Sequence, residues 1–171
     1  RFTEIARLHE DLPFVERCQR EAAQLRRNIE QNGWDGEWYL RAFFDDGSPL
    51  GSAGNPECQI DSIAQSWSVL SGAGDAERSA MAMEAVDKRL VRRDHRLIQL
   101  LDPPFDKSNL NPGYIKGYVP GVRENGGQYT HGAIWTAMAF AALGDSRRAW
   151  ELLTIINPVN HGRSTEEIET Y

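Results

Sequence analysis

Two segments of this chain carry the residue types that a carbohydrate site needs. The first is Asn32–Ala42, with the sequence NGWDGEWYLRA, and the second is Arg123–Trp135, with the sequence RENGGQYTHGAIW. Both combine carboxylates, aromatic rings and glycines. Aromatic rings stack on sugar faces, carboxylates bind hydroxyl groups, and a protonated carboxyl can donate its proton to a glycosidic oxygen. The two segments therefore indicate sugar chemistry.

In the first segment, Asp35 is the favoured proton donor. It stands between Trp34 and Gly36, where the indole lowers the local polarity and the glycine lets the backbone approach a ligand. Glu37 is the competing carboxylate, and it would lie on the opposite face if the segment is extended. The alternative is a half-buried strand with core tryptophans and solvated acids. The residues alone do not decide between these two interpretations.

In the second segment, Glu124 could bind sugar hydroxyls, while the glycines that follow it expose backbone donors. His131 lies at the predicted start of a helix, where free N–H groups and the helix dipole favour an anion. The alternative for His131 is a capping or packing role beside Thr130. Trp135, and Trp67 far upstream, are expected to be core residues because most tryptophans on helices are.

The elements that must position these segments are mainly helices. Apolar residues at helical spacing from Phe14 to Ile29, with Asp11 and Pro13 as start signals and Gly33 as a stop, predict a helix. An aromatic run predicts a short strand within Trp38–Phe44. A capping box at Ser164–Glu167 predicts the start of a further helix. Apolar spacing and turn signals predict four more helices, at Asp61–Ser71, Asp75–Val91, Thr130–Leu143 and Ser146–Ile156.

The helical hairpin is predicted to repeat. The turn at Gly74–Arg78 matches the turn at Gly144–Arg148, since each has a Gly-Asp pair before a helix. Repeated hairpins with long connections, such as His95–Tyr129, are typical of a helical toroid. The alternative is coincidence, because Asp after Gly is simply a good helix cap.

The composition limits the class of protein. Apolar residues make up 40% of 171 residues, enough for one domain-sized core, and no apolar run reaches the roughly 20 residues of a membrane span. The net charge of −6 argues against nucleic acid and anionic membranes as partners. Cys18 and Cys58 lack metal or redox spacing and are expected to be reduced. No metal site is predicted.

Four blocks in order resemble glycoside hydrolase family 94, which contains the inverting phosphorylases of cellobiose, chitobiose and related disaccharides. The blocks are Trp34–Ala42, Gln65–Gly72, Asn111–Tyr118 and Glu124–Ala133. Within that family, the sequence is most similar to the C-terminal phosphorylase-like domain of bacterial cyclic β-1,2-glucan synthases. The resemblance implies a mainly α fold that is part of an (α/α)6 barrel, with a few short strands in the connections.

The resemblance also implies roles for six residues. Asp35 would be the general acid, inorganic phosphate the nucleophile and co-substrate, and His131 the phosphate ligand. The substrate-binding residues would be Trp34, Glu37, Arg123 and Glu124. The implied reaction is phosphorolysis of a β-glucosidic bond, with β-1,2-glucan as the expected substrate and no other cofactor.

The chain departs from the family in its length. A barrel of twelve helices needs more than 171 residues, so residues 1–171 are expected to be a single segment of the catalytic domain of a larger enzyme. The isolated segment is expected to be inactive and to self-associate through open barrel edges. We expect a cytoplasmic location, with no membrane contact by this segment even if the parent is an inner-membrane protein.

Two other functions stay open at this point. The first is an inverting glycoside hydrolase in which Asp35 is the acid and Glu124 the base. The second is a noncatalytic carbohydrate-binding module. Dependence on phosphate would separate the phosphorylase from the hydrolase, and the absence of turnover would indicate the binding module.

Overall fold

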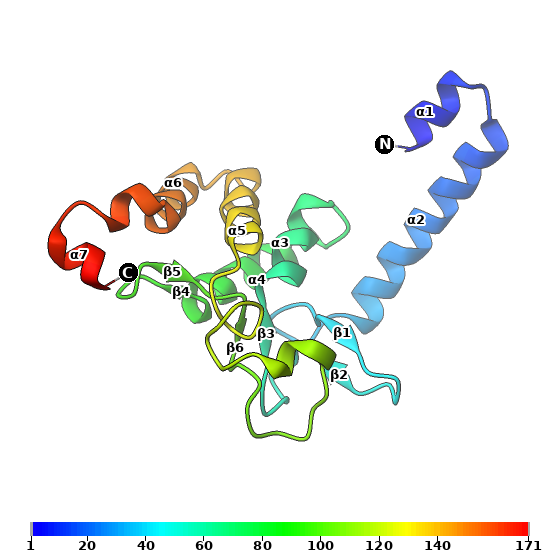
Figure 1. The fold of residues 1–171 in the computed structure, drawn as a ribbon. Coiled ribbons are helices and arrows are strands. Elements are labelled where there is room, and N and C mark those ends of the chain that lie inside the picture. Colours follow the sequence, from blue (N-terminus) through cyan, green and yellow to red (C-terminus); the bar gives the residue numbers. More distant parts are fainter. Residues whose placement is uncertain (1, 171) are drawn as a thin grey trace. The chain divides into compact units, whose positions relative to one another are not determined.

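The computed structural model describes residues 2–170 and divides into two compact units, Arg1–Trp34 and Asp35–Tyr171 (Figure 1). Within the described residues the chain is mainly helical, with short strands. The mainly helical class predicted from the sequence is therefore confirmed.

The N-terminal unit consists of two helices, α1 (Phe2–Leu8) and α2 (Leu12–Asn32), which pack on each other. The Asp11 side chain accepts a hydrogen bond from the N–H of Phe14, 3.1 Å away, and so caps α2. The helix ends at Gly33. The sequence predicted α2 with its start at Asp11 and Pro13 and its stop at Gly33, which is confirmed, but it did not predict α1.

The second unit alternates short strands with helices, and its elements follow in chain order. They are β1 (Ala42–Phe43), β2 (Pro49–Leu50), β3 (Ile60–Asp61), α3 (Ser62–Leu70), α4 (Ala76–Arg89), β4 (Val91–Arg92), β5 (Leu97–Ile98), β6 (Leu101–Asp102), the 3-10 helix η1 (Gly113–Gly117), α5 (Thr130–Ala142), α6 (Ser146–Ile156), the 3-10 helix η2 (Pro158–His161) and α7 (Thr165–Thr170). The strands form three antiparallel pairs, β1–β2, β3–β6 and β4–β5.

Helices α3 to α6 form the two predicted hairpins, α3–α4 and α5–α6, and α3 lies beside α5 (Figure 1). Each hairpin turn ends in an aspartate cap. The Asp75 side chain accepts from the N–H groups of Glu77 and Arg78, and the Asp145 side chain accepts from the N–H of Arg148. The Gly-Asp turns that suggested a repeat therefore begin the second helix of each hairpin.

Small residues bring α3 and α5 close together. The hydroxyls of Ser66 and Thr136 are 3.3 Å apart, and both residues are fully buried between the two helices. A Cβ atom at Gly132 would come within 3.0 Å of Leu100 Cδ1. The surrounding core is apolar and includes Ile60, Met83, Val86, Leu90, Phe140 and Leu152. The first turn of α5 is therefore held firmly against α3.

The β3–β6 pair connects the two predicted site segments. Asp61 at the end of β3 caps α3 and forms an ion pair with Arg41, with Arg41 Nε 3.5 Å from Asp61 Oδ2. Just before β6, the N–H of Leu100 donates to the carbonyl of Gly127 at 2.9 Å. Burial raises the pKa of Asp61, while Arg41 and the backbone N–H groups of α3 oppose this effect.

The strand predicted within Trp38–Phe44 is confirmed only at Ala42–Phe43, which pairs with Pro49–Leu50. Trp38 and Tyr39 are buried, but their polar groups serve other partners. The indole N–H of Trp38 lies 2.9 Å from the carbonyl oxygens of Gly51 and Gln59. The Trp38 side chain thus anchors this segment to Gly51 and Gln59, and the segment does not form a longer strand.

Both cysteines are free thiols, as expected. Cys18 on α2 is partly exposed, whereas Cys58 in the second unit is buried. Burial raises the pKa of Cys58 far above its usual value, and the nearby Asp61 acts in the same direction. Among residues 2–170, no helix combines the length and apolar character needed to cross a membrane.

Candidate active site

A pocket of about 420 Å³ lies at the start of α5. Its lining residues are Arg123, Glu124, Gln128, Tyr129, Thr130 and His131. Three of the side chains that the sequence singled out, Arg123, Glu124 and His131, therefore line one pocket. The second segment folds as a loop that leads directly into the helix, which is why residues close in sequence meet here.

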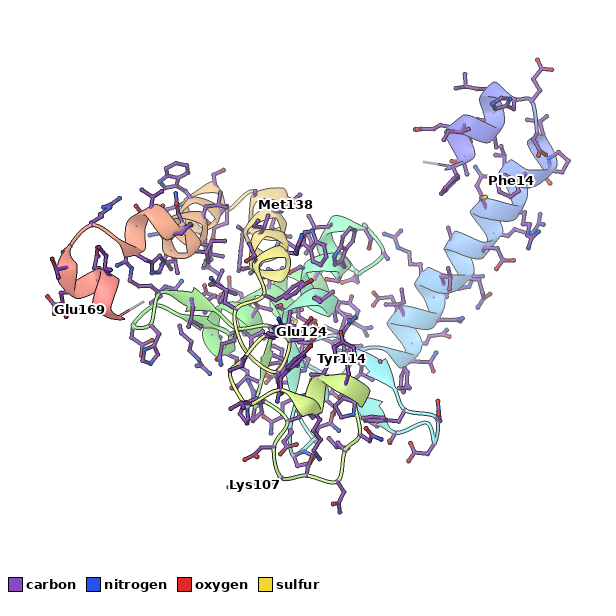
Figure 2. All side chains as sticks on the ribbon, in the orientation of Figure 1. Phe14, Lys107, Tyr114, Glu124, Met138 and Glu169 are labelled. Carbon is purple, nitrogen blue, oxygen red and sulfur yellow. The ribbon has the colours of Figure 1, made fainter. Side chains whose placement is uncertain are left out.

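Glu124 contributes a buried carboxylate oxygen to this site. Its Oε2 atom is shielded from solvent, and no hydrogen-bond partner for it lies among the residues that the structure describes. A buried carboxylate oxygen without a donor is energetically costly. The hydroxyl group of a bound sugar is a donor that could satisfy it once the atoms that shield this oxygen move aside. In the view of Figure 2, Glu124 lies near the middle of the second unit, while Lys107 lies at its edge.

The backbone around Glu124 is fixed by the next residue, Asn125, which is fully buried. Its Oδ1 accepts from the N–H of Phe105 at 2.7 Å, and its Nδ2 donates to the carbonyl oxygens of Phe105 and Tyr118, each at 2.8 Å. Sequence reasoning missed Asn125 as a site residue. Its amide joins three parts of the long connection and so holds Glu124 in place.

Two glycines after Asn125 are required by close packing. A Cβ at Gly126, where φ is +84°, would lie 2.9 Å from Pro104 Cβ. A Cβ at Gly127 would lie 2.8 Å from the carbonyl oxygens of both Gly121 and Arg123. The glycines that suggested exposed backbone donors therefore serve to let the loop fold tightly.

Arg123 presents a cation at the edge of the pocket. Its guanidinium donates to the Tyr118 hydroxyl at 3.3 Å and lies 5.3 Å from the centre of the Tyr118 ring. The hydrogen bond with Tyr118 raises the pKa of Arg123 above its already high value, and the nearby Glu124 carboxylate contributes in the same direction. The side chain is therefore a permanent positive charge beside Glu124.

His131 lies in the first turn of α5, as predicted. The preceding cap residue, Tyr129, makes no side-chain hydrogen bond to the helix N-terminus. The His131 ring lies 5.5 Å from the Tyr129 ring and 6.2 Å from the Trp135 ring, measured between centres. Free N–H groups at this helix end and the imidazole can both donate to an anion.

The prediction that Trp67 is a core residue is wrong in this structure. Its side chain is 43% exposed, and its ring packs edge-on against Trp135 at 5.5 Å. Trp135 is only partly buried. Gln65, two residues before Trp67, is fully buried. The sequence predicted that Trp67 lies on the inward face of α3. Gln65 lies on that face instead, because its amide group binds the backbone of Tyr39 and Asp61.

Asp35 lies in a different loop, before β1. Its Oδ1 accepts from the Ser52 hydroxyl at 2.9 Å and its Oδ2 from the N–H of Ala53 at 2.7 Å. The carboxylate thus has a fixed orientation and is partly exposed. Glu37 is exposed. Neither carboxylate is among the residues that line the pocket at α5, and Trp34 is the last residue of the other unit.

Glu57 is another residue that the sequence did not single out. It is buried, and its Oε1 accepts from the N–H groups of Lys107 and Ser108 at 2.7 and 3.0 Å. Its Oε2 accepts from the Ser108 hydroxyl. Burial opposes ionisation, but these hydrogen bonds outweigh it and lower the pKa of Glu57 to about 2. Glu57 therefore anchors the long connection that contains Asn125.

Comparison with known proteins shows the family to which the chain belongs. The family model described as "Glycosyl hydrolase 94 superfamily, catalytic domain" matches residues 1–171. The chain is 51% identical over 99% of its length to the cyclic beta-(1,2)-glucan synthase NdvB of Rhizobium meliloti (strain 1021), of which it covers 6%. It is 35% identical over 80% of its length to the solabiose phosphorylase of Paenibacillus borealis, covering 18% of that protein.

A third relative is the N,N'-diacetylchitobiose phosphorylase of Vibrio furnissii, with 32% identity over 93% of this chain and 20% of the relative. The chain therefore spans a fifth or less of the length of each of these three relatives.

Proposed function

Because the chain belongs to the catalytic domain of the glycosyl hydrolase 94 superfamily, we propose that the protein containing it breaks β-glucosidic bonds by phosphorolysis. The observation that carries this proposal is the pocket at α5, where Arg123, Glu124 and His131 meet. It combines a carboxylate oxygen that needs a donor with cationic and N–H groups that suit an anion. The hydroxyl groups of a sugar can donate to the carboxylate, and a phosphate can accept from the cationic and N–H groups.

The phosphate is proposed to bind at the first turn of α5. His131 and the free N–H groups of the helix end would donate to its oxygens, and the Arg123 guanidinium would add charge at the rim. These local donors are needed because the net charge of −6 repels an anionic nucleophile. Glu124 is proposed to accept hydrogen bonds from hydroxyl groups of the sugar.

Asp35 is proposed as the general acid. Its proton would pass to the glycosidic oxygen as the bond to the anomeric carbon breaks, while a phosphate oxygen attacks that carbon from the opposite face. The products are a sugar 1-phosphate of inverted configuration and the shortened saccharide. One carboxyl group suffices, since phosphate replaces the water that a second carboxylate would activate. The hydrogen bonds from Ser52 and Ala53 fix the orientation of the Asp35 side chain, and this fixed orientation supports the role.

Glu37 is proposed as a further sugar ligand from the segment that carries Asp35, and Trp34, the preceding residue in the chain, is proposed as a sugar-binding residue. We further propose that the two helical hairpins belong to an (α/α)6 barrel, because α3 and α5 pack side by side with α4 and α6 as their second helices. The substrate is proposed to be a β-1,2-glucan, since the relative with 51% identity is named a cyclic beta-(1,2)-glucan synthase. The chain alone is expected to be inactive.

The test is phosphorolysis of β-1,2-linked glucooligosaccharides by the full-length protein, with and without phosphate. We expect phosphate-dependent release of α-glucose 1-phosphate, and Asp35→Asn should reduce kcat by about 10²- to 10⁴-fold. Asp46→Asn, in an exposed turn, is the matched control and should retain activity.

Two other outcomes would overturn the proposal. Release of free glucose without phosphate would indicate a hydrolase that uses Asp35 and Glu124. Binding of the oligosaccharide with no turnover, unchanged by Asp35→Asn, would indicate a noncatalytic binding module.

A further inference from the structure

Four aromatic rings form a continuous row from the pocket at α5 to helix α3. The row runs from Tyr129 to His131, then to Trp135 and Trp67, with distances of 5.5, 6.2 and 5.5 Å between successive ring centres. Only the first two residues line the pocket. The function proposed above gives no role to the two tryptophans.

We propose that Trp135 and Trp67 are positioning residues that set the orientation of the His131 imidazole toward the bound phosphate. This inference rests on the proposed function of the pocket and extends it. It assigns the two tryptophans no contact with substrate. Their effect reaches the phosphate only through the histidine ring.

Among the described residues, His131 has few neighbours other than these rings to orient it. Its side chain is exposed, and an exposed imidazole on a helix can normally exchange between rotamers. Trp135 lies four residues later on α5, so its ring is the neighbour that the helix places beside His131. Together with Tyr129, it restricts the orientations that the imidazole can take.

Trp135 is itself held in place by α3. The Trp67 and Trp135 rings meet at an interplanar angle of 73°, the edge-to-face arrangement that aromatic pairs favour. The two helices cannot slide apart easily, because Ser66 and Thr136 meet in a buried pair. Because α3 is fixed, Trp67 restricts the Trp135 ring, and the Trp135 ring in turn restricts the His131 ring.

The ring contact of Trp67 is directed toward the pocket side and not toward the core. A 43% exposed tryptophan contributes little to the core of this unit. Its one described ring partner is Trp135, and the described ring partners of Trp135 are Trp67 and His131. The two tryptophans therefore link the exposed face of α3 to the pocket.

The experiment is a double-mutant cycle between Trp135 and His131 in the full-length protein, using phosphorolysis kinetics. Trp135→Leu removes the ring, and we expect it to raise KM for phosphate about 2- to 10-fold, with KM for the oligosaccharide unchanged. Trp135→Phe keeps a ring and should restore KM for phosphate. In the His131→Ala background, Trp135→Leu should cause no further change.

Trp67→Leu provides a second variant if Trp135→Leu fails to fold, with the same direction of change expected. Trp150→Leu is the matched control, because Trp150 on α6 is 73% exposed and lies outside the aromatic row. An equal effect of Trp135→Leu in both His131 backgrounds would overturn the inference, and so would an unchanged KM for phosphate in Trp135→Leu.

The failure of the proposed function is recognised separately. If His131→Ala leaves KM for phosphate unchanged, or if the protein shows no phosphate dependence, the function is wrong. The positioning of His131 is then measured by its rate of modification by diethyl pyrocarbonate, followed by mass spectrometry. A severalfold change in that rate in Trp135→Leu, but not in Trp135→Phe, supports the positioning role, and an unchanged rate overturns it.

Discussion

Gln65 and Tyr39 hold each other through two reciprocal hydrogen bonds. The Gln65 Oε1 atom accepts from the N–H of Tyr39, and its Nε2 atom donates to the carbonyl of Tyr39, each at 2.8 Å. Both residues are buried. The Gln65 side chain therefore bonds the N–H and the carbonyl of Tyr39, as a neighbouring strand would, in the segment that follows Asp35.

Replacing Gln65 by Met should destabilise the second unit strongly. Methionine has similar length but neither donor nor acceptor, so buried backbone groups of Tyr39 lose their partners. We expect the free energy of unfolding to fall by about 2–5 kcal/mol, since each unsatisfied buried group costs about 1–3 kcal/mol. Urea denaturation of the 171-residue chain measures this. Gln24→Met, on the exposed face of α2, should change stability by no more than about 0.5 kcal/mol.

Glu57 should make the stability of the chain depend on pH in the acid range. Its pKa in the folded state is about 2, below the ordinary value of 4.5. The stabilisation is therefore fully present above pH 4.5 and is lost as the pH falls from 4.5 to about 2. Glu57→Gln should lower the urea midpoint at pH 7, and its difference from the parent chain should shrink as the pH approaches 2.

The control for this titration is Glu16→Gln, at an exposed position of α2. It should leave the parent's pH profile unchanged. A constant difference between Glu57→Gln and the parent from pH 7 to pH 2 would contradict the assignment, because it would mean that loss of packing and not of charge lowers the stability.

Gly127→Ala should disrupt the loop that carries Glu124. The added Cβ would lie 2.8 Å from two backbone carbonyl oxygens, so the backbone itself must move. We expect phosphorolysis by the full-length protein to fall at least about 10-fold, since displacement of a binding group by about 1 Å can cost 100-fold. Gly117→Ala is the matched control, because nothing lies within 4 Å of its added Cβ. Similar activities for the two variants would argue against this role for the loop.

Ser52→Ala should lower kcat without abolishing it. The Ser52 hydroxyl donates to Asp35 Oδ1 at 2.9 Å, and a hydrogen bond between uncharged groups contributes about 0.5–1.5 kcal/mol. Asp35 must carry its proton to act as the acid, so we expect a fall in kcat of about 2- to 10-fold, measured by release of sugar 1-phosphate. Ser48→Ala, which affects only an exposed turn with Asp46, should have no effect. A Ser52→Ala enzyme with full activity would mean that Asp35 needs no such support.

The helical hairpins were predictable because their signals are local. Asp75 and Asp145 each follow a glycine and each cap the next helix, so the turn residues define the start of the helix without reference to the rest of the fold. The pocket at α5 was predictable for the same reason. Arg123, Glu124 and His131 are near each other in sequence, and the helix start was visible from its pattern.

Features that depend on distant partners could not be read from the sequence. The β4–β5 hairpin lacks a glycine turn, and Arg96 adopts φ of +54° there, so no turn signal marked it. The exposure of Trp67 depends on Gln65 facing inward to bind Tyr39. Ser52 was missed because its role arises only when its loop meets Asp35.

The burial of Cys58 has a practical consequence for labelling this chain. A thiol that stays protonated and shielded from solvent does not react with maleimides, whereas Cys18 on α2 is partly exposed. Since the sequence contains two cysteines, a fluorophore added to the folded chain should attach to the N-terminal unit alone. The natural sequence thus provides a single-site probe, and fluorescence anisotropy of that dye would report the motion of α2 without any substitution.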